Sequence, residues 1–417
     1  MPPVQPDGIE WPKNGHLDPA LAEVDQGRPF SLYVHVPFCT VRCGYCDFNT
    51  YTTGFGVGAE PGSYARSIEA EAQFGRRGLV NAGFEPRPAE TVFIGGGTPT
   101  LLDTDELAHI LDSLRNHFGI AQQAELTIEA NPDSIDAKGL LKLKEAGVTR
   151  VSFGMQSAVP QVLATLDRTH NPQKVPSAVQ AARDAGLDVS VDLIYGAPGE
   201  SIDDWHRSLD AAVALETDHI SAYALVIEEG TKMGAQVARG ELPMPDPDDE
   251  AIKYELADQV LTDAGFKWYE ISNFARPDVN EAGVEPTELR HASRHNLAYW
   301  RDWDWWGLGP GAHSHVGRYR WWNVKHPAAY AGRVQAGVSP ALAGEILQSD
   351  ARALEKVMLA VRTSEGIRTS DVINIHALPG LIADQLIDGV NALKGRVVLT
   401  LKGRLLADYV TRELMGF

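Results

Sequence analysis

Cysteine is scarce in this chain, with three residues among 417. So few thiols cannot build the disulfide framework that stabilises many secreted domains. Residues 1–7 contain neither a basic stretch nor an apolar run, so no signal peptide is visible at this end. Together these absences predict a reducing, cytoplasmic location.

Long apolar runs and an excess of positive charge are also lacking. No stretch of ~18 apolar residues occurs, so the sequence predicts no membrane span. Acidic residues outnumber basic ones by 56 to 37, and the formal net charge is −19. Because this field repels phosphate backbones and anionic lipid surfaces, we expect no nucleic-acid partner.

Apolar runs alternate with helical patterns from residue 31 onward, which predicts an α/β fold. Six such units precede the proline-rich break at 243–247, so we expect a partial (β/α)6 barrel rather than a full eight-stranded one. The expected strands cover 31–36, 91–95, 124–130, 150–155, 188–195 and 219–227. The expected helices cover 62–80, 103–118, 134–146, 172–186 and 201–215.

Composition divides the chain into three parts. Residues 1–27, rich in Pro, Gly, Asp and Asn, predict an extended arm rather than a packed element. Residues 28–275 hold the barrel, which ends with a helix over 248–264 and a strand over 266–274. Residues 276–417 form a smaller α+β domain after a polar linker at 276–290. Its last part resembles a winged helix, with helices over 350–363 and 378–393, a strand over 395–400 and a final helix over 402–415.

All the cysteines lie within eight residues, as Cys39, Cys43 and Cys46, directly after the first strand. Thiolates are the usual ligands of iron–sulfur clusters, which normally take four of them. Three thiolates would therefore leave one iron open to a small molecule. A closed zinc site is the first alternative, and His35 is its candidate fourth ligand. Three unrelated cysteines are the second.

The spacing C-x3-C-x2-C resembles that of the radical S-adenosylmethionine (SAM) superfamily. There the three cysteines hold a 4Fe-4S cluster and SAM chelates the fourth iron. The run from Tyr33 to Cys39 resembles the oxygen-independent coproporphyrinogen III oxidase family, which has a heme-chaperone branch. This likeness implies a six-unit radical SAM barrel. One departure divides the branches: the oxidases carry a further cysteine where this chain has Phe48.

Glycines follow the second strand, in the stretch Gly95-Gly96-Gly97-Thr98. The carboxyl ends of barrel strands are where such enzymes place their sites, and glycine lets backbone amides approach a ligand closely. The family resemblance implies that Gly96, Gly97 and Thr98 contact the amino group of SAM.

Two acidic residues stand at the ends of apolar strands or within them. Glu129 ends the third strand, and Asp192 lies inside the fifth. A carboxylate in such a strand is costly unless it is paired or faces a site. The resemblance implies SAM contacts for both.

Other cofactor-binding residues are implied by the family pattern. Gln156 follows the fourth strand, and the guanidinium of Arg168 can reach a carboxylate with a planar fork. Both match ligand-contacting positions of the oxidase family. Tyr33 and Tyr45 match two more, by position only.

Aromatic residues gather in 291–323, which holds six of the nine tryptophans. The motif HNxxYW, from His295 to Trp300, resembles the heme-binding signature of the chaperone branch. Imidazole is a common axial ligand of heme iron, so His295 is the predicted heme ligand. His313 and His315 are rival ligands. The alternative without iron is that His295 packs in a seam between domains.

Two functions fit these motifs best, and a radical SAM enzyme that acts on another substrate is a third, weaker candidate. The first is a heme chaperone that binds heme and passes it to acceptor proteins, on a scaffold that retains the 4Fe-4S cluster and SAM. Membrane respiratory enzymes are candidate acceptors. The second is an oxygen-independent coproporphyrinogen III oxidase, which uses a SAM-derived radical on propionate side chains. Phe48 and HNxxYW favour the chaperone, so we predict no coproporphyrinogen oxidase activity and assign no catalytic residue.

Overall fold

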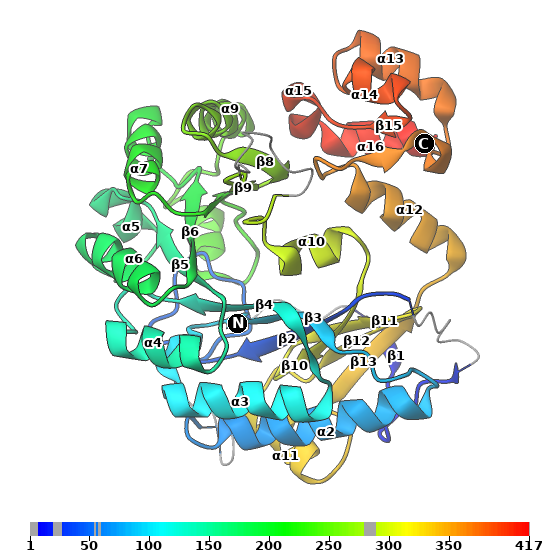
Figure 1. Ribbon diagram of the computed structural model, residues 1–417. Coiled ribbons are helices and arrows are strands. Elements are labelled where there is room, and N and C mark those ends of the chain that lie inside the picture. Colours follow the sequence, from blue (N-terminus) through cyan, green and yellow to red (C-terminus); the bar gives the residue numbers. More distant parts are fainter. Residues whose placement is uncertain (1–6, 20–26, 54–55, 57–59, 279–288, 417) are drawn as a thin grey trace.

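One large curved sheet dominates the fold. The structure, a computed structural model, describes residues 7–19, 27–53, 56, 60–278 and 289–416. Within them the sheet has thirteen strands, in the order β1-β13-β12-β11-β10-β2-β3-β4-β5-β6-β7-β9-β8. Figure 1 shows helices along the outer side of the sheet and one short helix, α10 (Arg294–Trp300), on its inner side.

Six parallel strands at the centre of this sheet confirm the predicted partial barrel. Apart from the exposed start of β4 and Tyr223 near the end of β7, these strands are almost wholly buried, because helices cover one face and the inner side closes round a cavity. Their bounds are β2 Phe30–Val36, β3 Ala89–Gly96, β4 Ile120–Ala130, β5 Arg150–Gln156, β6 Asp188–Tyr195 and β7 His219–Ala224.

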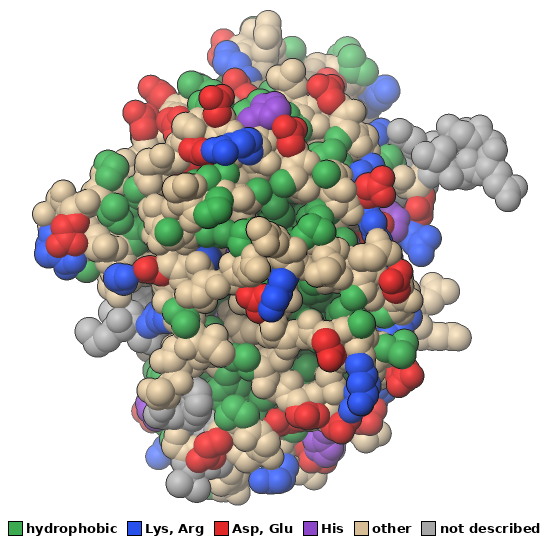
Figure 2. Space-filling view, turned by 90° about the vertical axis from the view of Figure 1, so that its left-hand side faces the viewer, with side chains coloured by type: hydrophobic (Ala, Val, Ile, Leu, Met, Phe, Trp, Pro, Cys, Tyr) green, Lys and Arg blue, Asp and Glu red, His purple; other side chains and the backbone are tan. Residues whose placement is uncertain are grey.

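Helices cover the outer face where their apolar positions predict. Acidic and basic side chains are scattered over the face of the molecule that Figure 2 shows. Side-chain caps set several starts: Asp103 accepts from the amide of Asp105, and Ser201 forms a capping box with Asp204. Two short helices, α5 and α8, were not predicted, because they are too short to show a periodic pattern of apolar residues. The helices are α2 Tyr64–Asn81, α3 Thr104–His117, α4 Ala137–Glu145, α5 Pro160–Thr165, α6 Val175–Asp184, α7 Ile202–Ala214, α8 Lys232–Ala238 and α9 Pro247–Asp263.

Antiparallel strands extend the sheet at both edges. The predicted strand at 266–274 is wrong in form, because a turn splits it into the hairpin β8–β9. On the other edge β10 runs parallel to β2, so the sheet continues across the predicted boundary at 275/276. That boundary stays a prediction about domains. The added strands are β8 Lys267–Glu270, β9 Asn273–Ala275, β10 Asp304–Leu308, β11 His313–Val316, β12 Tyr319–Asn323 and β13 Ala341–Ile346.

The N-terminal arm is packed where the structure describes it, contrary to the expectation for 1–27. Strand β1 (Ile9–Glu10) pairs with β13, and Trp11 stacks on Trp321 with ring centroids 5.3 Å apart. Leu17 is also buried. These large apolar side chains hold the segment against the sheet. They were overlooked because the composition of the segment as a whole is polar.

A separate apolar core lies at the C-terminal end, at the upper right of Figure 1. Predicted helices over 378–393 and 402–415 each prove to be two shorter helices. Its elements are α12 Ser349–Ala360, β14 Ile367–Arg368, α13 Leu378–Ala383, α14 Gly389–Leu393, β15 Arg396–Val397, α15 Leu401–Leu405 and α16 Ala407–Met415. Helix α11 (Pro327–Gln335) instead packs on α2, where Tyr330 donates to the buried Glu71.

Candidate cofactor site

A cavity of about 520 Å³ opens on the inner side of the sheet. Its walls come from strand ends, from the cysteine loop after β2 and from α10. Every residue predicted for the site lines it: Tyr33, Cys39, Cys43, Tyr45, Cys46, Gly96, Gly97, Thr98, Glu129, Gln156, Arg168, Asp192 and His295. The fold therefore brings the predicted residues, which are far apart in sequence, together in one cavity.

The backbone of the cysteine loop is tied down at several points. The Cys39 amide donates to the carbonyl of Tyr51 at 3.0 Å, and the Gly44 amide donates to that of Leu166 at 3.2 Å. All three cysteines are free thiols and partly buried. The loop thus presents them from one short, anchored segment.

The arrangement of the sulfurs argues against a single-ion zinc site. Sulfurs that share one zinc at about 2.3 Å lie roughly 4 Å apart. Among the described residues, the only three-residue group with ligand atoms all within 4.8 Å contains no cysteine. The wider spacing of the thiols suits three corners of a cluster better than one ion.

Hydrogen-bond donors surround the cysteine sulfurs. Arg168 Nη1 lies 3.7 Å from the sulfur of Cys43, and the Thr98 hydroxyl lies 4.0 Å from that of Cys39. Burial raises the pKa of Cys39 to about 11. Iron binding must therefore displace protons from these thiols, and the nearby donors stabilise the sulfur charge that results. This donor set fits a 4Fe-4S cluster.

Gly97 permits a close approach beside the cysteine loop. A Cβ at this position would lie 2.4 Å from the Phe38 carbonyl and 2.9 Å from the Cys39 sulfur. Both distances are shorter than van der Waals contact allows, so a larger residue would push the two segments apart. The strand end and the loop are thus packed as one unit.

Glu129 connects the glycine stretch to the cavity. Its Oε2 accepts a hydrogen bond from the Gly96 amide at 2.9 Å. Burial, and then the negative charge of Asp192, raises the pKa of Glu129 to about 8. A carboxyl group so disfavoured as an anion will bind a cation strongly, and SAM carries positive charge on its amino and sulfonium groups.

Asp192 lies across the cavity, where the Ser152 hydroxyl donates to it at 3.0 Å. Burial raises its pKa, an effect that hydrogen bonds and the charge of Arg168 oppose. Arg168 is itself oriented by donation to the carbonyl of Gly154 at 2.8 Å. Gln156 holds a left-handed φ of 62°, uncommon for a residue other than glycine.

The two tyrosines occupy different walls. Tyr33 donates to His35 Nδ1 at 2.9 Å, because His35 Nε2 donates to the Asn49 carbonyl at 3.0 Å. Burial raises the pKa of Tyr33. Tyr45 lies on the cysteine loop, and burial raises its pKa as well. Both side chains are therefore neutral donors at the cavity wall.

His295 has both ring nitrogens engaged within the protein. Nδ1 lies 2.8 Å from the Thr91 hydroxyl and Nε2 lies 2.9 Å from the Tyr299 hydroxyl. Because Thr91 donates onward to Ser31, it accepts from Nδ1, and Nε2 accepts from Tyr299. Burial lowers the pKa of His295 to about 3, so the ring is neutral. Its free electron pair is occupied, and it could ligate iron only after Tyr299 moves.

The rival histidines do not line the cavity. His315 is fully buried, and its Nε2 lies 3.0 Å from the Gly317 carbonyl. His313 is exposed and stacks on Trp322 with centroids 5.7 Å apart. Neither is placed to share a ligand with the cysteines.

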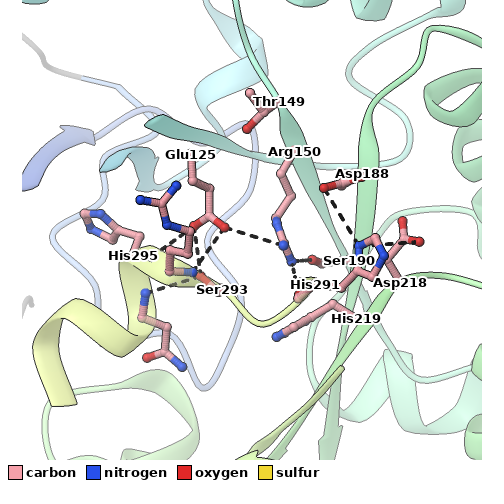
Figure 3. Close-up of polar contacts among 12 residues, drawn as sticks. Glu125, Thr149, Arg150, Asp188, Ser190, Asp218, His219, His291, Ser293 and His295 are labelled. Atoms are coloured by element: carbon pink, nitrogen blue, oxygen red, sulfur yellow. Dashed lines mark hydrogen bonds and ion pairs between the residues drawn. The ribbon is translucent and has the colours of Figure 1, made fainter. Parts of the chain in front are cut away.

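A buried polar network holds α10 against the sheet, as Figure 3 shows. Glu125 accepts from the backbone amides of Arg294 and His295 at 3.1 and 3.0 Å, and it pairs with Arg150 at 3.5 Å. Sequence reasoning missed this pair. The signal was present in the sequence. The argument applied to Asp192, that a charged residue in an apolar strand must be paired or face a site, applies equally to Glu125 and Arg150.

Known proteins share this fold. The radical SAM superfamily profile matches residues 33–212. The chain also superposes on coproporphyrinogen III oxidase (HemN) from Escherichia coli with a TM-score of 0.77 and 24% identity, over 95% of this chain and 92% of that one. This likeness concerns the fold. Fold and site together define a radical SAM protein.

Closer relatives identify the branch. The chain is 46% identical over 401 residues to the heme chaperone HemW of Mycobacterium tuberculosis (strain ATCC 25618 / H37Rv), covering 95% of this chain and 97% of that one. It is 31% identical over 398 residues to HemW of Bacillus subtilis (strain 168), covering 93% and 99%. The chain belongs to the HemW family.

Helix lengths and composition also bear on membranes. Among the described residues, no helix combines the length and the apolar character that a bilayer span requires.

Proposed function

We propose that this protein is a heme chaperone, which binds heme and delivers it to acceptor proteins in the cytoplasm or at its membrane. The observation that carries the proposal is the near full-length identity to HemW relatives, 46% over 97% of one of them. Membrane respiratory enzymes are the candidate acceptors.

The cysteine loop and the strand ends supply the cofactor-binding part of this function. Cys39, Cys43 and Cys46 would hold a 4Fe-4S cluster through three sulfurs. When bound, the cluster supplies an electron-transfer centre with one iron open to SAM. Glu129 and Asp192 would take up the positive groups of SAM, and Gly96 and Gly97 give its amino acid part close access to the backbone.

An apolar rim around the cavity supports binding of a flat porphyrin. Four exposed side chains line the cavity at this rim: Val41, Phe48, Tyr223 and Val226, which are 47%, 56%, 43% and 65% exposed. Exposed apolar groups gathered at one opening are unusual unless they receive a ligand. The porphyrin face would lie against them.

Phe48 also bears on the oxidase alternative. Its phenyl ring stands at the cavity where the oxidases carry a cysteine, and it has no thiol and no hydrogen-bond donor. An oxidase step that needs the cysteine would fail here. We therefore infer that coproporphyrinogen III is not the substrate.

Transfer of bound heme tests the proposal. Heme-loaded protein, freed of excess heme, is mixed with a spectrally distinct apo-form of a heme protein, and the acceptor's absorption is followed. We expect transfer faster than from heme-loaded serum albumin under the same conditions. Failure to retain heme through gel filtration would overturn the proposal.

A matched pair of variants tests the predicted ligand. If His295 ligates iron, His295→Ala should weaken or shift the Soret band, and Tyr299→Phe should leave it or strengthen it by freeing Nε2. A Soret band that neither variant alters would assign the iron ligand elsewhere while retaining the chaperone function.

A further inference from the structure

A second cluster of ligating side chains lies at the starts of the strands, whereas the cysteine loop follows the end of β2. Asp188 begins β6, Asp218 immediately precedes β7, and His291 lies just before α10. One ligand atom from each residue lies within 4.8 Å of the other two. Figure 3 shows the imidazole between the two carboxylates.

The distances in this cluster are too long for hydrogen bonds. His291 Nδ1 is 3.9 Å from Asp188 Oδ2 and 3.9 Å from Asp218 Oδ1. That nitrogen is buried and has no hydrogen-bond partner. A protonated imidazole would draw a carboxylate to about 2.8 Å, so a shared proton does not explain the spacing.

The surroundings of the second ring nitrogen of His291, Nε2, indicate where the lone pair of the imidazole lies. Nε2 lies 3.4 Å from Asp278 Oδ1, and hydrogen on Nε2 is the tautomer that favours this contact. Nδ1 then directs a lone pair at two carboxylates. Metal-bound histidines commonly have this arrangement, with the second nitrogen donating to a carboxylate.

The charges of this cluster are not balanced by the protein. Within the described part of the chain, Asp188 and Asp218 have no ion-pair partner except His291. Their side chains are 35% and 29% exposed, so an ion from solvent can reach them. Two anions and a lone pair that converge on one point lack a positive centre.

We propose that Asp188, Asp218 and His291 bind a divalent transition-metal ion of the zinc type. One nitrogen and two carboxylate oxygens are ligands that zinc accepts at about 2.0–2.2 Å, with water able to fill the fourth position. Imidazole does not suit calcium or magnesium, which prefer all-oxygen shells. Small side-chain rotations bring the three atoms round a common ion.

The ion would join distant parts of the chain. It connects the starts of β6 and β7 to the segment that leads into α10. The backbone carbonyl of His291, in this segment, already accepts a hydrogen bond from Arg150 at 2.8 Å. A metal that closes a long chain segment stabilises the folded state. Its role is structural, because the cysteines lie at the other ends of the strands and none of the three ligands lines the cavity.

Metal analysis of the holoprotein tests the site. Protein with a reconstituted cluster is equilibrated anaerobically with a small excess of Zn²⁺, desalted and analysed for zinc and iron together. We expect one zinc per chain in the wild type, none in His291→Ala or Asp218→Asn, and unchanged iron in all three. Asp278→Asn should weaken zinc binding by about 10–100-fold.

Controls separate this site from other binding. His206→Ala removes an exposed histidine that lies 3.0 Å from Asp210, and it should retain the zinc. Co²⁺ in place of Zn²⁺ should give visible d–d bands without the sulfur-to-cobalt charge-transfer band that cysteine ligation produces. Three results would each overturn the proposal. They are absence of zinc from the wild type, zinc in His291→Ala and Asp218→Asn at the wild-type level, and a cobalt spectrum with a thiolate charge-transfer band.

Discussion

Replacing Glu129 by glutamine tests the electrostatics of the cavity. The substitution keeps an oxygen that can accept from the Gly96 amide, 2.9 Å away, but removes the ionisable group. Burial and Asp192 raise the pKa of Glu129 from 4.5 to about 8. Between these two pH values the carboxyl group is protonated in the folded protein and ionised in the unfolded chain.

The sign of the effect follows from proton binding. Because the folded state binds more protons in this window, the wild type loses stability as pH rises from 4.5 to about 8. A shift of this size corresponds to at most ~5 kcal/mol at ~1.4 kcal/mol per pH unit. Water in the cavity screens the charge, so we expect Glu129→Gln to be more stable than the wild type by about 1–3 kcal/mol above pH 8.

Urea unfolding without SAM, at several pH values and under anaerobic conditions, measures this difference. The two proteins should be equally stable near pH 4.5 and diverge steadily to pH 8. Calorimetry in buffers of different ionisation enthalpy should also show that SAM binding near pH 7 releases more protons from the wild type than from the variant. A stability difference independent of pH, or a variant less stable at pH 8.5, would refute the reasoning.

Three further substitutions test separate parts of the structure. Cys43→Ala should abolish the cluster, because two sulfurs remain, and normal iron content after anaerobic reconstitution would contradict the assignment. Asp192→Ala should weaken SAM binding while leaving iron content intact, as calorimetric titration can show; unchanged affinity would misplace the SAM site. Glu125→Ala leaves the buried Arg150 unpaired and should cost about 3–5 kcal/mol in urea unfolding, whereas a loss below ~1 kcal/mol would mean that the pair contributes little.

Local patterns indicated the barrel because its strands are short apolar runs between amphipathic helices. The cysteine spacing and the strand-end glycines marked the site because each motif is contiguous in sequence. The hairpin at β8–β9 was not visible, because Ile271 and Ser272 form a turn without glycine or proline. Periodicity alone cannot divide such a segment.

Long-range pairing was the part that local patterns could not supply. Nothing in the sequence near Asp304–Leu308 states that this strand pairs with β2, and the burial of Trp11 depends on Trp321, far along the chain. The state of His295 likewise depends on Thr91, a residue of another strand. The motif marked the histidine, but the structure shows that its nitrogens are already engaged.

A competition experiment tests the central claim most directly. Reconstituted protein is incubated anaerobically with SAM, a reductant and equal amounts of heme and coproporphyrinogen III, then separated by gel filtration. The heme-chaperone function predicts that heme elutes with the protein at a ratio near one per chain, with a Soret band, and that coproporphyrinogen III is recovered unchanged. Formation of protoporphyrinogen, with no heme retained by the protein, would contradict it.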